Sequence, residues 1–423
     1  MQNNTLYIFL KEKKVIIYLA FYFTLILGFI FNENSTGGAL IDYNNQKFAV
    51  ISFANDFIYS FLNYEKFSTR HSPILIILLS LLEKINFDDY LVRLIHLHLC
   101  LLLPYIFYKI LVEKFGKDLD VIYIILSCLI FLSPTFRTLS IWPDSRILGL
   151  IFFSLSILQF IKFQKTKNYS YTIYIIILYS IASYLSPNFS VFSIFYFIYF
   201  VSTFNFFSKK VFIIIILNIL ISLPAIYYIF ILDVNFINKS AAVGLNPEKN
   251  ILFTNIFNNI LITLSLVFFY LIPFIFTKVL VINKKIFSVK NILISSIVFI
   301  ILTLNFNYNY DLSGGGIIYK FSHYIFNNNL IFFLFCLFSI LFLFTIFQNN
   351  KMNYLLLLLI ILNNPQYTIY HKYFDPFLII MFFSLFSFKF ELNQILKFKN
   401  LIIINIYFIC FLIVNNLRSL WNI

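Results

Sequence analysis

The sequence predicts an all-α, polytopic transmembrane helical bundle of about thirteen spans, with interfacial helices in the first external loop. The 423-residue chain is 61% hydrophobic, 21% aromatic and only 11% charged, a composition that soluble globular domains do not have. Apolar runs recur along the chain, each close to the roughly 20 residues that a helix needs to cross a bilayer core. We expect a single integral-membrane domain over residues 1–423.

The net charge of +14 follows the pattern of a membrane protein. Many lysines fall in short turns between apolar runs, at residues 162–167, 208–210 and 283–285, and others precede the first run at residues 11–14. Positive charge collects in short cytoplasmic loops, so we place these turns and the N-terminus in the cytoplasm. Membrane lipid, and not nucleic acid, is therefore the expected partner of the basic charge.

The first span is predicted at about residues 15–31, and a long external loop follows at about residues 32–90. Within this loop, apolar residues recur at helical spacing from Val50 to Phe61, which predicts an amphipathic helix lying in the plane of the membrane interface. The apolar stretch 73–82 is too short to cross a membrane and is also predicted to be interfacial or re-entrant. Because the loop collects acids, cations and a histidine, we interpret it as a catalytic loop.

The rest of the chain alternates further spans with short turns and two more external loops, at residues 233–258 and 305–329. This arrangement puts most acids and all five histidines on or near the outer side, so we expect the chemistry at the outer face of the membrane. The predicted spans lie at about residues 91–112, 119–134, 147–163, 171–186, 188–207, 211–232, 259–280, 291–304, 330–347, 354–362, 376–388 and 401–414.

Three carboxylates are candidate catalytic groups. Asp42 follows a Gly-Gly pair, and Asp42 and Asp56 are predicted to share the polar side of one helix whose other side is held in the lipid. A carboxylate at a membrane surface is most often only solvated, but this arrangement can aim an acid at a cavity between loop and spans. Asp144 lies beside Arg146 in the turn before the fourth span, where charges are costly unless they are paired or functional.

The basic residues of the external loops are candidate phosphate contacts. Arg70 and His71 stand directly before Ser72-Pro73, where an arginine offers a fork of donors to a phosphate. The alternative is an interfacial anchor, since Arg and His often lie at headgroup depth. His371 and Lys372 precede the twelfth span in a segment rich in side chains that bind phosphate or sugar.

Arg93, His96 and His98 lie in the first two turns of the second span. Arg93 and His96 share a helical face, whereas two histidines only two residues apart point in different directions. They lack the i, i+4 spacing of a zinc-binding pair, so we expect hydrogen bonding within the membrane for these histidines. The sequence requires no metal site, and a divalent cation as cofactor stays open.

Over about residues 15–165 the layout resembles the GT-C superfamily of polytopic glycosyltransferases, in particular the protein O-mannosyltransferase and lipid A aminoarabinose-transferase group. In that group an acid follows the first span, interfacial helices come next, a Pro-Pro motif leads into a short apolar stretch, and an arginine opens the second span. The matching residues here are Asp42, the helix around Val50 to Phe61, His71-Ser72-Pro73 and Arg93.

The chain departs from that group at two motifs. The usual acid pair is Asp42-Tyr43 here, and the Pro-Pro motif is Ser72-Pro73. The subfamily therefore stays open, and the dolichyl-phosphate glucosyltransferases, which share a similar loop, remain an alternative.

The resemblance implies a glycosyltransferase that moves a sugar from a polyprenyl-phosphate donor to a glycan, lipid or protein acceptor at the periplasmic or luminal face. We expect it in a bacterial inner (plasma) membrane, with the active site on the outer side. Asp42 is the expected general base, supported by Asp56 and Asp144. The expected contacts of the donor phosphate, where negative charge develops, are Arg70, His71, Arg93, Arg146, His371 and Lys372.

Two other functions are compatible with a polytopic membrane protein. A polysaccharide polymerase or ligase would use a pyrophosphate-linked donor and would carry its large outer loop in the second half of the chain. A transporter or flippase of a lipid-linked glycan would show paired halves and charges at mid-membrane positions. The long first loop and the ionisable residues at the outer ends of the spans favour the glycosyltransferase.

Overall fold

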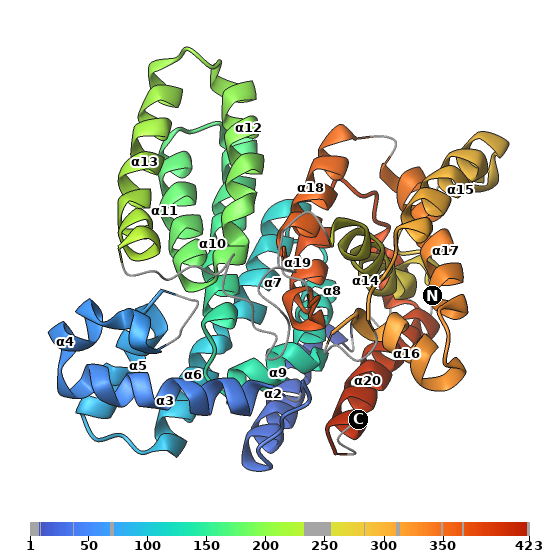
Figure 1. Ribbon diagram of the computed structural model, residues 1–423. Coiled ribbons are helices and arrows are strands. Elements are labelled where there is room, and N and C mark those ends of the chain that lie inside the picture. The colour runs from blue at the N-terminus through green and yellow to red at the C-terminus, as the bar shows by residue number, and fades with distance from the viewer. Residues whose placement is uncertain are drawn as a thin grey trace. The chain divides into compact units, whose positions relative to one another are not determined.

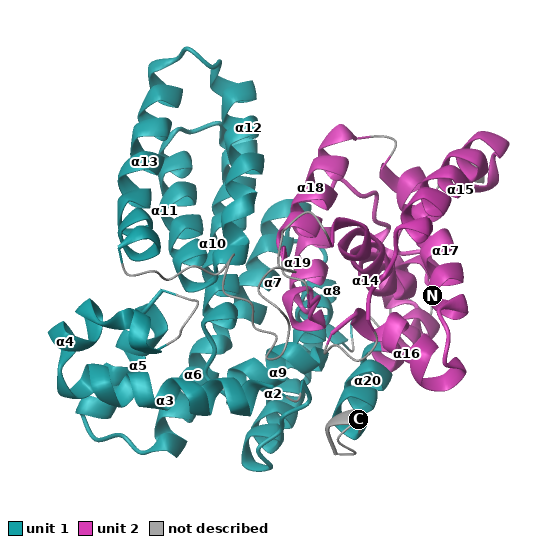
Figure 2. Ribbon diagram, in the orientation of Figure 1, with its two compact units in different colours: residues 1–236, 408–423 teal, residues 237–407 magenta. Residues whose placement is uncertain are grey.

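The structure is a computed structural model that describes residues 8, 10–36, 38–67, 72–231, 255–282, 284–309, 314–347, 350–365 and 368–420 (Figure 1). Within these ranges the chain forms helices and no strand, apart from an isolated antiparallel bridge between Leu280 and Phe390. The predicted all-α fold class is confirmed. Two compact units are formed, residues 1–236 with 408–423 and residues 237–407 (Figure 2).

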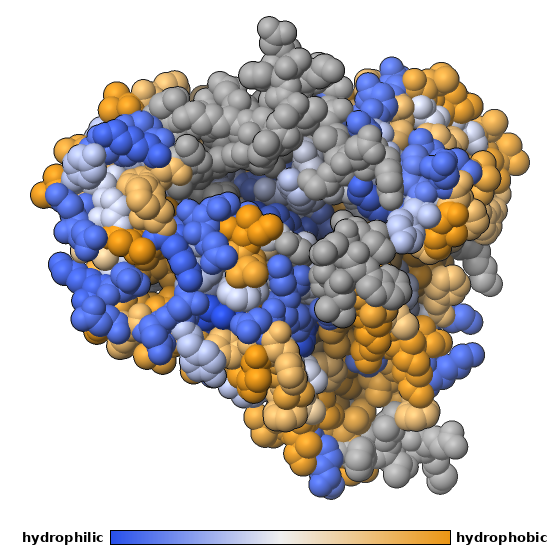
Figure 3. Space-filling model, turned by 60° about the horizontal axis from the view of Figure 1, so that its bottom comes forward, coloured by the Kyte–Doolittle hydropathy of each residue, from blue (hydrophilic) through white to orange (hydrophobic). Residues whose placement is uncertain are grey.

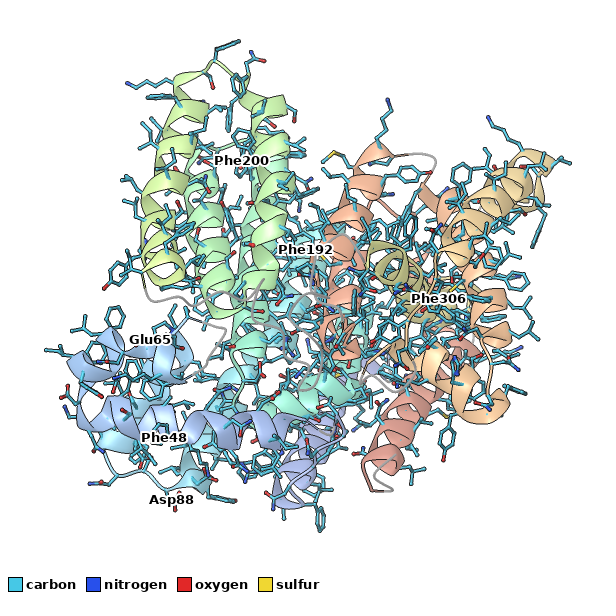
Figure 4. All side chains as sticks on the ribbon, viewed as in Figure 1. Phe48, Glu65, Asp88, Phe192, Phe200 and Phe306 are labelled. Carbon is cyan, nitrogen blue, oxygen red and sulfur yellow. The ribbon has the colours of Figure 1, made fainter. Side chains whose placement is uncertain are left out.

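Unit 1 begins with the apolar helix α2 (Lys14–Ile30), which is followed by the helices of the predicted first loop. These are α3 (Ala39–Asn55), α4 (Phe57–Leu62), η1 (Tyr64–Phe67) and α5 (Ile74–Lys84). The apolar stretch Asp89–Phe115 comes next and consists of α6 (Asp89–Cys100) and α7 (Leu102–Phe115). Asp88 starts α6 because its carboxylate accepts a hydrogen bond from the Leu91 amide at 2.7 Å (Figure 4).

A bent pair of helices follows in unit 1. α8 (Asp120–Cys128) continues through η2 (Leu129–Leu132), and α9 (Pro134–Ile141) leaves it at an angle of 67°. Ser133 caps α9 through its side chain and Pro134 occupies the first turn, so the sequence Ser-Pro defines the bend. The unit continues with α10 (Ser145–Thr166), α11 (Ser170–Leu185), η3 (Pro187–Phe192), α12 (Ser193–Phe204) and α13 (Lys209–Phe230).

Unit 2 packs its elements around the almost fully buried helix α14 (Ile256–Phe276), which contacts α15, α16, α17, α18 and α19. The last helix, α20 (Phe398–Leu420), begins in this unit and crosses its boundary between residues 407 and 408. The other elements are η5 (Lys284–Phe287), α15 (Val289–Leu304), α16 (Gly316–Phe326), α17 (Leu330–Phe347), α18 (Lys351–Leu362), η6 (His371–Tyr373), α19 (Phe377–Ser384) and η7 (Leu392–Leu396).

Seven helices in the described part of the chain are long and apolar enough to cross a membrane, or eight if the bent pair counts as one span. Four shorter apolar helices, α2, α11, α15 and α18, coincide with further predicted spans. α19, at the predicted twelfth span, extends over about 12 Å and is too short to cross a bilayer core by itself. A helical membrane protein is thus indicated, and the count of thirteen spans stays a prediction.

The predicted amphipathic helix from Val50 to Phe61 is two helices, not one. Asp56 has an extended backbone, with φ −142° and ψ 97°, and its carboxylate accepts a hydrogen bond from the Tyr59 amide. Asp is a strong N-cap residue, and this preference outweighs the apolar periodicity that runs through the position. The chain therefore ends α3 at Asn55 and starts α4 at Phe57.

The exposed apolar face of α3 is also not the face predicted to lie in the lipid. Val50 and Phe53 are buried because α3 packs against α5. Instead, Ile41, Phe48 and Ile51 are the exposed apolar residues of α3, and Phe48 lies on its outer side (Figure 4). Figure 3 turns this end of the molecule forward and shows hydrophilic residues gathered at its left, with hydrophobic residues between them.

Candidate functional site

The segment between α2 and α3 is fixed by a buried ion pair between Glu33 and Arg137. Arg137 Nε donates to both carboxylate oxygens of Glu33, at 2.9 and 2.8 Å, and Nη2 also donates to the Thr24 carbonyl at 2.8 Å. The two side chains are 9% and 6% exposed. Gly28 leaves room for the pair, since a Cβ there would overlap the Glu33 carboxylate. The ion pair therefore joins the end of α2 to α9.

Arg93, on α6, is buried at the same end of unit 1. Its Nε donates to the Ile141 carbonyl at 3.1 Å, and its Nη2 donates to Asn32 Oδ1 at 2.8 Å. Its guanidinium carbon lies 3.6 Å from the centroid of the Trp142 ring, so the cation stacks on the indole. The two hydrogen bonds use two of the five N–H donors of the guanidinium.

Trp142 connects these groups to α3. Its indole Nε1 donates to the Glu33 carbonyl at 3.0 Å, and its ring lies 6.1 Å from the Tyr43 ring, centroid to centroid. Tyr43 donates in turn to Asp89 at 2.8 Å. Burial, and then this hydrogen bond to a carboxylate, raises the pKa of Tyr43 well above its ordinary value of 10, so the phenol stays a donor at neutral pH.

Asp42 lies one residue before Tyr43, in the first turn of α3, and is half-buried. The partial positive charge of a helix N-terminus stabilises a carboxylate at this position. The Tyr43–Trp142 contact brings this turn of α3 to the segment that begins at Trp142. The predicted acid of the first loop thus belongs to the same end of unit 1 as Arg93.

Asp144 and Arg146 follow Trp142 at the start of α10. Asp144 caps the helix, because its carboxylate accepts a hydrogen bond from the Arg146 amide at 2.7 Å. The side chains of both residues are buried. The sequence predicts a tight outer turn at this position. In the structure it is a buried junction between α9 and α10, and it carries a carboxylate and a guanidinium together.

His96 and His98 form hydrogen bonds, as predicted for the histidines at the start of the second span. His96 Nε2 lies 3.0 Å from the Leu139 carbonyl, and His98 points elsewhere, with its Nε2 at 2.9 Å from the Tyr22 hydroxyl. Within the described ranges, no three His, Cys, Asp or Glu residues are grouped so that they could hold a metal ion. The histidines of α6 serve as hydrogen-bonding groups within the helix bundle.

Asp56 does not share a helix with Asp42. Thirteen residues of α3 lie between them, so about 21 Å separates the two positions along the helix axis. Asp56 is exposed and caps α4, which is a structural role for its carboxylate. Arg70 and His71, the predicted phosphate contacts of the same loop, lie outside the described residues.

His371 and Lys372 form a group of their own in unit 2. His371 Nε2 lies 2.7 Å from the Tyr270 hydroxyl, and the Lys372 ammonium lies 5.4 Å from the centroid of the Tyr370 ring. Both side chains are half-buried, and Asp375 is buried three residues further on. These polar groups would suit a phosphate or a sugar hydroxyl. They belong to unit 2, whereas the contacts described for the Asp42 region are made by residues of unit 1.

Glu33 and Trp142 are the two residues of this region whose importance sequence reasoning missed. Glu33 stands at the end of the first apolar run, and Arg137 stands at the end of the third. A charged side chain at membrane depth is costly without a partner. One acid and one arginine at the ends of apolar runs could therefore have predicted this ion pair. Trp142 has no comparable signal in the sequence, because its stacking on Arg93 is a contact between residues 49 positions apart.

Comparisons with known proteins identify no family: no family model, no curated protein and no solved structure matches this chain.

Proposed function

We propose that this protein is a membrane glycosyltransferase that transfers a sugar from a polyprenyl-phosphate donor to an acceptor at the outer membrane face. The observation that supports this proposal most is the stack of Tyr43, Trp142 and Arg93. It joins the turn of α3 that carries Asp42 to a buried guanidinium and to the start of α10, with Asp144 and Arg146. An acid and buried cations at one end of the unit are the combination that transfer from a phosphate leaving group needs.

In the proposed reaction Asp42 acts as the general base. The acceptor hydroxyl gives its proton to the Asp42 carboxylate, and its oxygen forms the new bond to the anomeric carbon of the sugar. The bond between that carbon and the phosphate oxygen breaks, and the polyprenyl phosphate leaves with the electron pair. Arg93 and Arg146 stabilise the charge that develops on the departing phosphate.

The position of these cations suits a lipid-linked donor. Arg93 and Arg146 lie in the first turns of the spanning candidates Asp89–Phe115 and Ser145–Thr166, at the ends of apolar helices. A polyprenyl tail lying between such helices would hold its phosphate at headgroup depth, close to the level of these arginines. The enzyme is proposed to work in a bacterial inner (plasma) membrane, with Asp42 facing outward.

Consumption of the donor tests the proposal. The purified full-length protein is reconstituted into vesicles with a mixture of glycan, lipid and protein acceptors and with polyprenyl-phosphate sugars radiolabelled in the polyprenyl phosphate, and the released polyprenyl phosphate is separated by thin-layer chromatography. We expect release to depend on the protein, and the Arg93→Met variant to lose at least tenfold in rate. The absence of release from every donor tested, by protein shown to be folded, would contradict the proposal.

A further inference from the structure

A pocket of about 500 Å³ lies within unit 2, where α14 ends and α20 begins. Lys278, Lys397 and Lys399 line it together with apolar residues such as Ile272, Phe276 and Ile403. The pocket belongs to neither of the two groups of candidate site residues described above. It therefore requires an explanation of its own.

The walls of the pocket are held in place by hydrogen bonds between distant parts of the chain. Asn400 Nδ2 donates to the Thr277 carbonyl at 2.9 Å and to the Gln394 carbonyl at 2.8 Å. Tyr407, further along α20, donates to the Phe269 carbonyl of α14 at 2.9 Å. The C-terminal half of α14 and the N-terminal half of α20 are thus joined at two levels, and the pocket is a built feature and not a gap between loosely packed helices.

The charge of the pocket is positive. The side chains of Lys278, Lys397 and Lys399 are exposed, and none of them forms an ion pair with another described residue. The residues that line the pocket include no Asp or Glu among those described, and α20 starts at Phe398 with its N-terminus toward these lysines. The helix N-terminus adds a partial positive charge, so an anion is the ligand that this rim favours.

The pocket also has an apolar side, next to the ends of two helices that could span a membrane. α14 and the 398–417 part of α20 are both long and apolar enough to span a membrane, and the pocket lies at the end of one and the start of the other. Phe276, 75% exposed, and Phe398, 66% exposed, stand beside the lysines. A ligand with a charged head and an apolar tail fits this combination better than a wholly polar one.

We propose that this pocket binds the phosphate-bearing headgroup of an anionic membrane lipid. The three lysines hold the phosphate, and Ile272, Phe276 and Ile403 contact the upper part of the acyl chains. Basic pockets between spanning helices on the cytoplasmic side of a membrane are suited to such headgroups. The lysine-rich turns place this end of α14 and α20 on the cytoplasmic side. The inference is independent of the proposed transfer of sugars.

Lipid titration of the full-length protein tests this site. The protein is purified in a mild detergent, phosphatidylglycerol or phosphatidylcholine is added stepwise, and bound lipid is counted by native mass spectrometry. An interfacial lysine contributes about fivefold to the binding of an anionic surface, so the triple variant Lys278→Gln, Lys397→Gln, Lys399→Gln is expected to bind phosphatidylglycerol about a hundredfold more weakly. Its binding of phosphatidylcholine is expected to change little.

A matched variant removes the same charge elsewhere. Lys209→Gln, Lys290→Gln, Lys351→Gln changes three exposed lysines in the first turns of α13, α15 and α18, none of which lines the pocket. This variant is expected to bind phosphatidylglycerol like the wild type. Equal binding by wild type and the pocket variant, or an equal loss in both variants, would overturn the site.

A second arm separates the lipid from a free anion. Inorganic phosphate at millimolar concentration is added during the phosphatidylglycerol titration. We expect it to leave lipid binding within twofold, because it lacks the apolar contacts. Complete displacement by phosphate alone would show that the pocket takes a soluble phosphate and would overturn the lipid assignment.

Discussion

The guanidinium carbon of Arg93 lies 3.6 Å from the centroid of the Trp142 ring, and Arg93 Nε donates to the carbonyl of Ile141, the residue directly before Trp142. One side chain of α6 thereby holds both the end of α9 and the aromatic ring that follows it. Since Trp142 also contacts Tyr43 of α3, this pair connects the loop acid to the bundle.

The stack predicts a measurable coupling between its two members. A double-mutant cycle with Arg93→Met and Trp142→Leu should give an interaction energy of about 1–2 kcal/mol, because a desolvated cation on an indole is worth about that much. The free energies come from SDS-induced unfolding of the protein in mixed micelles. Strict additivity of the two single changes would show that the stack does not stabilise the protein.

The Glu33–Arg137 pair makes a second prediction. Glu33→Gln should lower the stability by about 3–5 kcal/mol, because it leaves a buried guanidinium without its counter-charge. The double variant Glu33→Gln, Arg137→Met should recover part of that loss, since it removes the uncompensated charge. Both values are measured by the same SDS unfolding. A loss in the double variant as large as the sum of the single losses would contradict the pairing.

An exposed ion pair of unit 1 provides the control for that experiment. Lys165 Nζ lies 3.0 Å from Glu113 Oε1, and both side chains are substantially exposed. Glu113→Gln should change the stability by less than about 1 kcal/mol, because solvent screens surface pairs. The contrast between Glu33 and Glu113 isolates the effect of burial.

The helices were predictable because their signals are local. The seven described helices that are long and apolar enough to cross a membrane coincide with predicted spans, and the predicted short apolar stretch 73–82 coincides with α5 (Ile74–Lys84). The break at Asp56 was misjudged because two local signals competed there, apolar periodicity and the N-cap preference of Asp. The cap prevailed since the residues around it, Val50 and Phe53, could be buried against α5 without a continuous helix.

The site was only partly predictable, because its contacts are distant in sequence. Asp42, Arg93, Asp144 and Arg146 could be named one by one as charges at the mouths of spans. Their connection through Tyr43 and Trp142, and the partnership of Glu33 with Arg137, depends on pairs about 50 to 100 residues apart. Hydropathy and spacing carry no information about which ends of two helices meet.

The orientation of the chain in the membrane is testable by cysteine labelling. In a background with Cys100, Cys128, Cys336 and Cys410 replaced by serine, an impermeant maleimide added from outside should label Asn45→Cys on α3 but not Lys165→Cys on α10. Positive charge favours the cytoplasmic side, which gives this expectation. Labelling of Lys165→Cys from outside, without permeabilisation, would show that the predicted orientation is inverted and that Asp42 faces the cytoplasm.

The proposed donor contacts predict a loss of donor use. Arg146→Ala should reduce the rate at low donor concentration by about one to two decades, since a charge-assisted hydrogen bond is worth roughly 1.5–3 kcal/mol. Rates are measured over a range of donor concentrations with protein shown to be folded. Normal kinetics in this variant would leave Arg70 and Arg93 as the remaining candidates for the phosphate.

The central claim is that Asp42 is the general base, and Asp42→Asn tests it most directly. The variant keeps the size of the side chain and can still occupy the first turn of α3, so expression and donor binding should persist. Asp56→Asn is the matched control, because Asn caps a helix as well as Asp does and α4 should be retained. We predict that Asp42→Asn lowers single-turnover transfer by about 10²–10⁴-fold, the range for general-base catalysis, while Asp56→Asn transfers at the wild-type rate. Full transfer by Asp42→Asn, with donor bound as in the wild type, would contradict the account.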